Sequence, residues 1–205
     1  MRITLLDNHD SFAWNLAHDL GRGGHDVRVV KGGCWSDEVW RETDALVLSP
    51  GPGLPEEHPQ LSEVLGGAIE RGMPTLGVCL GMQAMASHWG ARLANLPQPL
   101  HGRQSTIHWE DDAGCWGGLP KSMEVGHYHS WVVEEDSLPS GLKALARNEK
   151  GLLMALAHES LPVAGVQFHP ESVLTPEGRR LLQDWAEYAQ RCLAISASNV
   201  SLKRS

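Results

Sequence analysis

Short apolar runs alternate with amphipathic segments along the first half of the chain. The apolar runs occupy residues 3–6, 27–30, 45–48 and 74–78. Between the last two, residues 59–71 carry apolar side chains three and four positions apart, the spacing of one helix face. Strands separated by helices predict a parallel sheet covered by helices on both faces. We therefore expect an α/β fold with an open, mostly parallel sheet flanked by helices.

The pattern changes over residues 100–170, where short alternating segments replace the helical spacing. Examples are Ser105–Trp109, Tyr128–Val133 and Val163–Phe168, which we expect to extend the sheet as mixed or antiparallel strands. A last helix is predicted to begin at Thr175–Glu177, where a capping threonine precedes a proline. No repeat or linker interrupts the chain, so we expect one domain over residues 1–195 and a disordered polar tail over 196–205.

Composition narrows the classes of protein. With 205 residues, 41% of them hydrophobic, the chain can fill a sizeable core, and its formal net charge is −8. Lys and Arg are not concentrated anywhere, which argues against a nucleic-acid partner. No apolar run approaches membrane-spanning length, and an acid comes too early for a signal peptide. We expect a soluble, cytoplasmic protein with no membrane partner.

The four cysteines lie far apart in the sequence and form no Cys-x-x-Cys pair. This spacing argues against a zinc site and against a disulfide framework, so we expect no metal in this chain. A single cysteine can still serve as a nucleophile, and composition does not say which one.

Cys79 ends an apolar run in the stretch Leu76-Gly77-Val78-Cys79-Leu80-Gly81. Glycines two positions away on each side give this stretch the form of a nucleophile elbow, in which a strand turns abruptly into a helix. The thiol would then stand at a helix N-terminus, where the dipole favours the thiolate, and the Leu80 N–H would face an oxyanion. A buried cysteine packed between a strand and a helix explains this short motif equally well.

His169-Pro170-Glu171 follows another strongly apolar run. Positions two apart in an extended segment project to the same side, so Glu171 can fix the tautomer of His169, as a catalytic base requires. Of the eleven histidines, only His169 has an acid so placed at the end of such a strand. A plain turn that closes the strand is the competing interpretation.

The loop Ser49–Gly53, Ser-Pro-Gly-Pro-Gly, comes at the end of a third predicted strand. Its prolines make it stiff, and its glycines allow backbone N–H groups to approach a ligand closely enough to complete an oxyanion hole with Leu80. An ordinary Pro/Gly turn has the same composition. Because ligands of parallel sheets bind at the carboxyl ends of the strands, this loop and Cys79 are expected on one edge.

Four motifs occur in a fixed order along the chain: Ser-Pro-Gly-Pro-Gly at 49–53, Gly-Val-Cys-Leu-Gly-Met-Gln at 77–83, Tyr-His-Ser at 128–130 and Gln-Phe-His-Pro-Glu-Ser at 167–172. In this combination the chain resembles the class I (triad-type) glutamine amidotransferases. Within that class it is most similar to anthranilate synthase component II and to the related glutaminase subunit of aminodeoxychorismate synthase. The resemblance runs from about residue 3 to residue 194 and implies a flavodoxin-like sheet.

The resemblance implies a role for each matching residue. Cys79, His169 and Glu171 would form a triad that hydrolyses L-glutamine to glutamate and ammonia through a thioester on Cys79. The remaining matches would bind the glutamine or its oxyanion; they are Gly51, Pro52, Gly53, Leu80, Gln83, Ser130 and Trp131.

The resemblance also implies a partner. A large synthase subunit would use the ammonia to aminate chorismate, giving anthranilate for tryptophan synthesis; no cofactor is expected in this chain, and Mg²⁺ is expected in the partner. Other possibilities are service to the folate pathway through aminodeoxychorismate, service to both pathways, or a glutaminase of the GMP-synthetase type. A flavodoxin-like interaction protein with an idle triad is the non-enzyme alternative, and three intact triad residues argue against it.

Three positions depart from the family pattern. His9 replaces a usual Tyr, His127 a usual Arg, and Trp131 a usual Leu. A backbone role at position 131 survives a change of side chain. His127 and His129 have the spacing of a metal pair but no further ligand in sequence, so hydrogen-bonding or solvated histidines are the better prediction.

Overall fold

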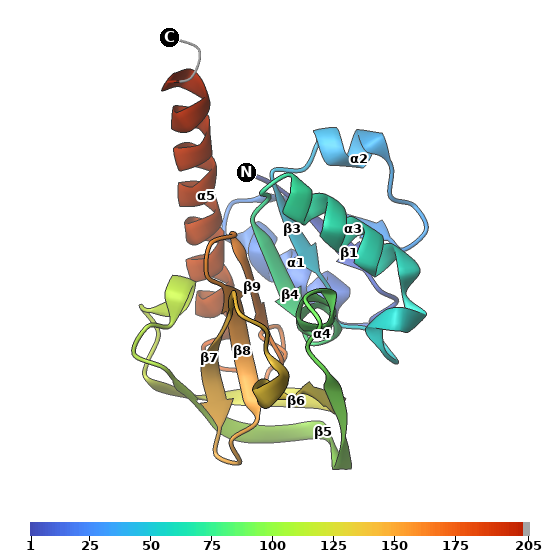
Figure 1. The fold of residues 1–205 in the computed structure, drawn as a ribbon, viewed down its shortest axis with the longest axis vertical. Helices are drawn as coiled ribbons and strands as arrows, with labels where there is room; N and C mark the ends of the chain where they lie inside the picture. The colour runs from blue at the N-terminus through green and yellow to red at the C-terminus, as the bar shows by residue number, and fades with distance from the viewer. Residues whose placement is uncertain (203–205) are drawn as a thin grey trace.

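The computed structural model describes residues 1–202, and side-chain burial through residue 198. Within this range one sheet of nine strands runs in the order β2-β1-β3-β4-β9-β8-β7-β5-β6 (Figure 1). The strands fall into a parallel half that begins at β2 and an antiparallel half that ends at β6.

The parallel half confirms the predicted open α/β sheet. Its strands are β1 (Arg2–Asp7), β2 (Asp26–Lys31), β3 (Ala45–Leu48), β4 (Thr75–Val78) and β9 (Val163–Val166). Every residue of the central strands β3, β4 and β9 is buried, as expected for strands covered on both faces.

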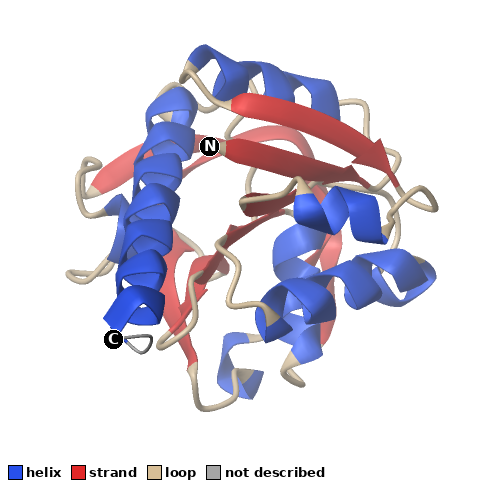
Figure 2. Cartoon of the chain, turned by 90° about the horizontal axis from the view of Figure 1, so that it is seen from above, coloured by secondary structure: helices blue, strands red, loops and turns tan. Residues whose placement is uncertain are grey.

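Two layers of helix provide that cover (Figure 2). The helices are α1 (Ala13–Arg22), α2 (Asp37–Arg41), α3 (Pro59–Glu70), α4 (Leu80–His88) and α5 (Gly178–Leu202). Helices α1 and α5 pack Leu16 and Trp185 into one core cluster with Val47 of β3. Helices α3 and α4 pack against Leu46, the residue before Val47 in β3, in a second cluster. Neighbouring strand residues therefore serve opposite faces, as the pleat requires.

The antiparallel half confirms the predicted extension of the sheet. It consists of β5 (Leu93–Trp109), β6 (Ser122–Val133), β7 (Leu142–Asn148) and β8 (Leu153–His158). Strands β5 and β6 pair over most of their length, with register irregularities near Leu100 and Arg103. This long ribbon curls beneath the carboxyl ends of the parallel strands (Figure 1), so that β6 contacts α4.

The last helix differs from the sequence expectation at both ends. It begins at Gly178 because Thr175 is engaged elsewhere: its hydroxyl donates to the His169 carbonyl (2.7 Å) and accepts from the Gly126 N–H (2.9 Å). The disordered tail expected from residue 196 is helical through Leu202, and the Ser198 hydroxyl donates to the Ala194 carbonyl within it. The remaining residues of the expected tail, 203–205, lie outside the described residues.

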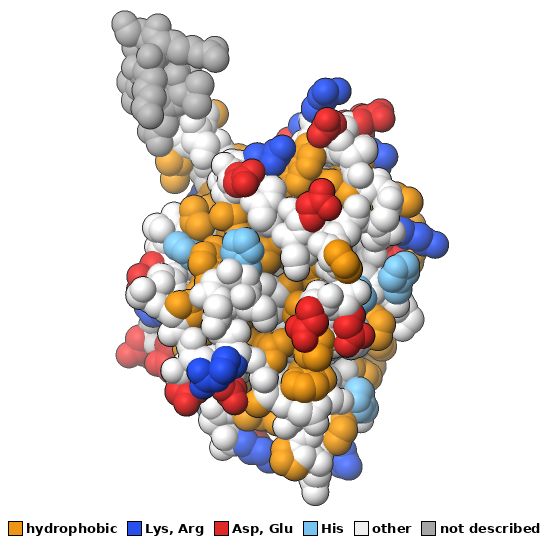
Figure 3. All heavy atoms as spheres, turned by 45° about the vertical axis from the view of Figure 1, so that its right-hand side comes forward, with side chains coloured by type: hydrophobic (Ala, Val, Ile, Leu, Met, Phe, Trp, Pro, Cys, Tyr) orange, Lys and Arg blue, Asp and Glu red, His pale blue; other side chains and the backbone are white. Residues whose placement is uncertain are grey.

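Helix α2 was not expected from the sequence, because five residues are too few to show a helical period. The Ser36 hydroxyl caps it, and Val39 is its buried residue. Across the described residues 1–202, none of the helices is both long and apolar enough to cross a membrane. On the face shown in Figure 3, acidic and basic side chains are interspersed among apolar ones.

Candidate active site

Cys79 occupies the bend between β4 and α4, as the elbow motif predicts. Its backbone is left-handed (φ 52°, ψ −103°), a conformation that costs a residue with a side chain about 1–3 kcal/mol. The Cys79 N–H donates to the Val166 carbonyl of β9 at 2.8 Å, which fixes the bend to the sheet. Leu80 is the first residue of α4, so its N–H has no acceptor within the helix.

The glycines on either side of Cys79 are required by close packing. A Cβ on Gly77 would lie 2.6 Å from the backbone carbon of Gly81, and one on Gly81 would lie 2.8 Å from the Leu48 Cβ. Both separations are well inside van der Waals contact, so the strand and the helix can meet this tightly only with glycine at both positions.

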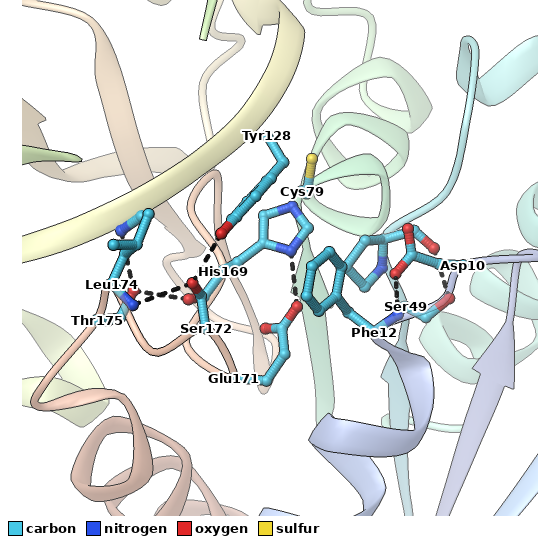
Figure 4. Close-up of polar contacts among 12 residues, drawn as sticks. Asp10, Phe12, Ser49, Cys79, Tyr128, His169, Glu171, Ser172, Leu174 and Thr175 are labelled. Carbon is cyan, nitrogen blue, oxygen red and sulfur yellow. Dashed lines mark hydrogen bonds and ion pairs between the residues drawn. The ribbon is translucent and has the colours of Figure 1, made fainter. Parts of the chain in front are cut away.

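His169 and Glu171 form a buried pair beside the elbow. Nδ1 of His169 lies 2.6 Å from Oε1 of Glu171, and the two side chains are 2% and 0% exposed. Figure 4 shows the imidazole standing between the Cys79 sulfur and the Glu171 carboxylate. Among the described residues, Nε2 of His169 has no hydrogen-bond partner, which leaves it free on the Cys79 side. This geometry favours the catalytic interpretation of His-Pro-Glu over a plain turn.

The charge state of His169 follows from its neighbours. Burial by itself lowers the pKa of His169, but contact with Cys79 and the hydrogen bond to Glu171 outweigh it and raise the pKa to about 10. The raised pKa favours a proton on Nε2 of His169, the ring nitrogen on the Cys79 side.

The surrounding chain holds the imidazole in place. The His169 N–H donates to the Gly126 carbonyl of β6 at 3.0 Å. Its ring makes edge contacts with Phe12 and Tyr128, at centroid distances of 5.5 and 5.0 Å. The Tyr128 hydroxyl in turn lies 3.2 Å from the Ser172 hydroxyl. Strand β6, far from His169 along the sheet order, thus fixes its position through the curl of the ribbon.

The loop at residues 49–53 is anchored to the end of β1. The Asn8 N–H donates to the Ser49 hydroxyl at 2.9 Å, and the Asn8 side chain donates to the Ser49 carbonyl at 3.0 Å. A Cβ on Gly51 would lie 2.6 Å from Cδ2 of Leu80, so the loop packs directly against the first residue of α4. The two predicted oxyanion donors, Gly51 and Leu80, are therefore brought together.

A cavity of about 190 Å³ lies in front of Cys79. It is smaller than the roughly 300–1,000 Å³ of pockets that hold drug-sized ligands, and it suits a single amino acid better. Its lining residues are Gly51, Pro52, Gly53, Cys79, Gln83, His101, Tyr128, His129, Ser130 and Trp131.

The cavity gathers most of the residues that the sequence predicted. Leu80 packs behind Gly51, and His169 and Glu171 lie in the wall beside Cys79. Ser130 faces His101, with its hydroxyl 3.2 Å from Nε2 of that histidine. The structure thus brings all the predicted residues to one place, while their individual roles stay predictions.

Gln83 is held by two acceptors. Its Nε2 donates to the Trp131 carbonyl (2.9 Å) and to Oε1 of Gln167 (3.1 Å). The carbonyl can only accept, which fixes the orientation of the Gln83 amide. Both Nε2 hydrogens are used, so its oxygen is the atom that it can offer to a ligand.

Gln167 is a site residue that sequence reasoning missed. It is fully buried, and its Nε2 approaches the Cys79 sulfur at 3.6 Å. Asn8, Tyr128 and His129 were likewise assigned no role. Its place at the start of the Gln-Phe-His-Pro-Glu-Ser motif was the sequence feature that could have drawn attention to Gln167. Its contact with Cys79 is visible only in the tertiary structure. In the described part of the chain, no group of three or more His, Cys, Asp or Glu side chains is placed to hold a metal ion.

An open α/β sheet with a cysteine at a strained strand–helix bend, facing a buried histidine–carboxylate pair, defines a cysteine-dependent acyl-transfer enzyme. The family model for glutamine amidotransferase class-I matches residues 4–188. The chain therefore belongs to the class I glutamine amidotransferase family.

Proteins with similar sequences support this assignment. The chain is 40% identical over 189 residues to anthranilate synthase component 2 of Mycobacterium tuberculosis, covering 90% of this chain and 81% of the relative. It is 35% identical to anthranilate synthase component 2 of Azospirillum brasilense, covering 92% and 97%. It is 45% identical to aminodeoxychorismate synthase of Streptomyces griseus, covering 93% of this chain but 26% of that larger protein.

Solved structures show the same fold. A glutamine amidotransferase from Thermotoga maritima superposes with a TM-score of 0.76 at 16% identity, covering 94% of this chain and 98% of the other. The shared architecture confirms the expected fold class.

Proposed function

We propose that this chain is the glutaminase subunit of a chorismate-aminating synthase, with anthranilate synthase as the first candidate. The observation that carries the proposal is the buried His169–Glu171 pair beside the strained Cys79, at a cavity sized for an amino acid. Similarity to two anthranilate synthase component 2 proteins, each covered over at least 81% of its length, supports the choice of synthase.

In the proposed reaction the Cys79 sulfur attacks the side-chain carboxamide carbon of L-glutamine. The N–H groups of Gly51 and Leu80 stabilise the oxyanion that forms. The C–N bond then breaks as Nε2 of His169 gives its proton to the departing nitrogen, which releases ammonia and leaves a γ-glutamyl thioester. Water, deprotonated by His169, hydrolyses the thioester to glutamate and restores the thiolate–imidazolium pair.

Recognition of the substrate is assigned to Gln83, Ser130 and Trp131, which line the cavity. The free oxygen of the Gln83 amide suits the ammonium group of an amino acid, because both Nε2 hydrogens are already bound. The backbone at Ser130 and Trp131 would hold the amino-acid end of glutamine.

The ammonia would pass to a larger partner subunit, in which Mg²⁺ is expected. Free ammonia would be protonated and lost in water, so a docked partner with an enclosed passage suits this chemistry. We expect glutaminase activity to be low in the isolated chain and to rise in the complex.

Aminodeoxychorismate synthase is a second candidate, favoured by the 45% identity to the Streptomyces griseus protein. Product analysis separates the two candidates. With the cognate large subunit, chorismate and glutamine, formation of anthranilate supports the first and formation of aminodeoxychorismate supports the second.

The Cys79→Ala variant tests the proposed chemistry. In complex with the large subunit it should lose glutamine-dependent synthesis, because no thioester can form, and keep synthesis driven by added ammonium salt. Steady-state rates with each nitrogen source provide the measurement.

Cys34→Ala is the matched control, since Cys34 is an exposed cysteine outside the cavity. It should retain both activities. Glutamine-dependent synthesis that persists in Cys79→Ala would show that the nucleophile is assigned wrongly.

A further inference from the structure

Two buried histidines form a hydrogen-bonded chain behind the substrate cavity. The Ser105 hydroxyl lies 2.7 Å from Nε2 of His127, and Nδ1 of His127 lies 3.2 Å from Nε2 of His129. Nδ1 of His129 then lies 3.0 Å from the Trp131 carbonyl. This series of hydrogen bonds begins on β5, continues along β6 and ends at the cavity wall.

The chemistry of the last acceptor fixes every proton in this chain. A carbonyl oxygen only accepts, so Nδ1 of His129 carries a hydrogen and its Nε2, in the neutral ring, accepts. His127 must therefore donate from Nδ1, which leaves its Nε2 to accept from the Ser105 hydroxyl. Only one arrangement of the neutral rings satisfies all three bonds.

Burial keeps both rings neutral. His127 is fully buried and His129 is 4% exposed. Burial lowers the pKa of His127 to about 4, with nearby His169 acting in the same direction. Burial also lowers the pKa of His129 to about 3, and His127, His169 and His101 add to this effect against the Trp131 carbonyl, which favours the charged ring.

The Trp131 carbonyl links this chain to the substrate wall. It accepts a hydrogen bond from His129 and another from the Gln83 amide. A single oxygen therefore connects the histidines to the side chain that is proposed to bind the substrate. Both Trp131 and His129 line the cavity. A shift of this carbonyl would therefore move Gln83 as well.

We propose that His127, aligned by Ser105, is a positioning residue that anchors the His129 ring through a hydrogen bond and thereby sets the Trp131 carbonyl and the Gln83 amide for recognition of the amino-acid substrate. The inference rests on the proposed function, because it gives that same cavity its specificity. It also gives a role to a position at which this chain departs from the family pattern.

A pair of amide substitutions separates this role from simple space filling. In His127→Asn the amide nitrogen can replace Nδ1 and still donate to His129. In His127→Gln the amide reaches the Nε2 position toward Ser105 and leaves His129 without its donor. A third variant, His127→Leu, removes both contacts, and thermal unfolding verifies that each variant is folded.

The readout is covalent labelling of Cys79 by a glutamine analogue that carries a diazoketone in place of the carboxamide. Peptide mass spectrometry follows Cys79, and the dependence of rate on concentration separates the binding constant KI from the maximal rate. Iodoacetamide, which needs no amino-acid recognition, measures the intrinsic reactivity of the thiol.

We expect KI to rise about tenfold in His127→Gln and His127→Leu, the effect of one lost hydrogen bond, and to stay near wild type in His127→Asn. The iodoacetamide rate should be unchanged in all three. Equal KI in Gln and Asn variants, or wild-type KI in His127→Leu, would overturn the proposal. If a destabilised variant is lost, the Asn and Gln comparison still decides. Absence of saturable labelling in the wild type would instead refute the Cys79 assignment.

Discussion

In the proposed reaction Glu171 acts only through His169. Its carboxylate bonds Nδ1, on the side of the imidazole away from Cys79, and is completely buried. It holds the ring orientation and favours the charged imidazole, as does contact with Cys79. Burial by itself would lower the pKa of His169, but the contacts with Cys79 and Glu171 outweigh it, so the pKa is raised.

Glu171→Gln tests this arrangement at the residue scale. We expect kcat for glutamine hydrolysis to fall by about 10²–10⁴, the usual contribution of an oriented acid–base group, with little change in KM. Because Glu171 raises the pKa of His169, its loss should also move the alkaline limb of the kcat/KM profile to lower pH.

Glu63→Gln, on the exposed side of α3, is the matched control and should behave as wild type. Hydrolysis rates from pH 6 to 10.5 are the measurement. A wild-type kcat with an unmoved alkaline limb in Glu171→Gln would contradict the assigned role.

The shape of the β4–α4 elbow depends on glycine at positions 77 and 81. Helix α4 begins immediately after Cys79 and lies so close to β3 that Gly81 touches Leu48. The strained Cys79 backbone is maintained because the strand and the helix on either side are fixed by burial.

Gly81→Ala should disrupt this packing. We expect a loss of about 1–3 kcal/mol in the free energy of unfolding, the usual cost of overpacking a rigid contact. Activity should fall further than stability suggests, because the thiol moves with the bend. Denaturant unfolding and glutamine hydrolysis measure the two effects.

Gly66→Ala in α3 provides the contrast. The nearest atom to an added Cβ there lies 3.9 Å away, so alanine should stabilise the helix by about 0.5–1 kcal/mol and leave activity unchanged. Equal behaviour of the two variants would show that close packing at the elbow is not what requires Gly81.

At the scale of the whole molecule, an exposed apolar residue follows the triad closely in sequence. Val173 is 95% exposed only two residues after Glu171, in a turn fastened to β6 through Ser172 and Tyr128. Exposed apolar side chains can mark a surface that binds another protein, so the face around Val173 is where we expect the proposed large subunit to dock.

Val173→Asp should therefore weaken assembly with the large subunit by about tenfold, the effect of losing about 1.4 kcal/mol of apolar contact. Titration calorimetry gives the Kd, and hydrolysis by the isolated chain should be unaffected. Ile195→Asp is the control. Ile195 is 62% exposed, and it lies about 26 Å from the first residue of α5, measured along the helix axis. A larger effect at Ile195 than at Val173 would place the partner on a different face.

The sequence by itself determined the parallel half of the fold, and it predicted the three triad residues that the structure places together. Strand 45–48 is a continuous apolar run because both its faces are buried, and helix 59–70 has the spacing of a helix buried on one face, so local pattern is enough to predict both. Cys79, His169 and Glu171 were found because each stands in a motif whose chemistry depends on neighbours in the chain.

Only the tertiary structure decided what depends on contact between distant segments. The curl of β5 and β6 brings His127, His129 and Trp131 to the cavity wall, and burial there lowers the pKa of both histidines. Gln167 meets Cys79 across 88 positions of sequence. The start of α5 was misplaced for the same reason: Thr175 looks like a helix cap locally, but the backbone of His169 and Gly126 competes for its hydroxyl and holds it. Local pattern records which face of an element is buried, whereas the partner that satisfies a polar group is set by where the folded chain places it.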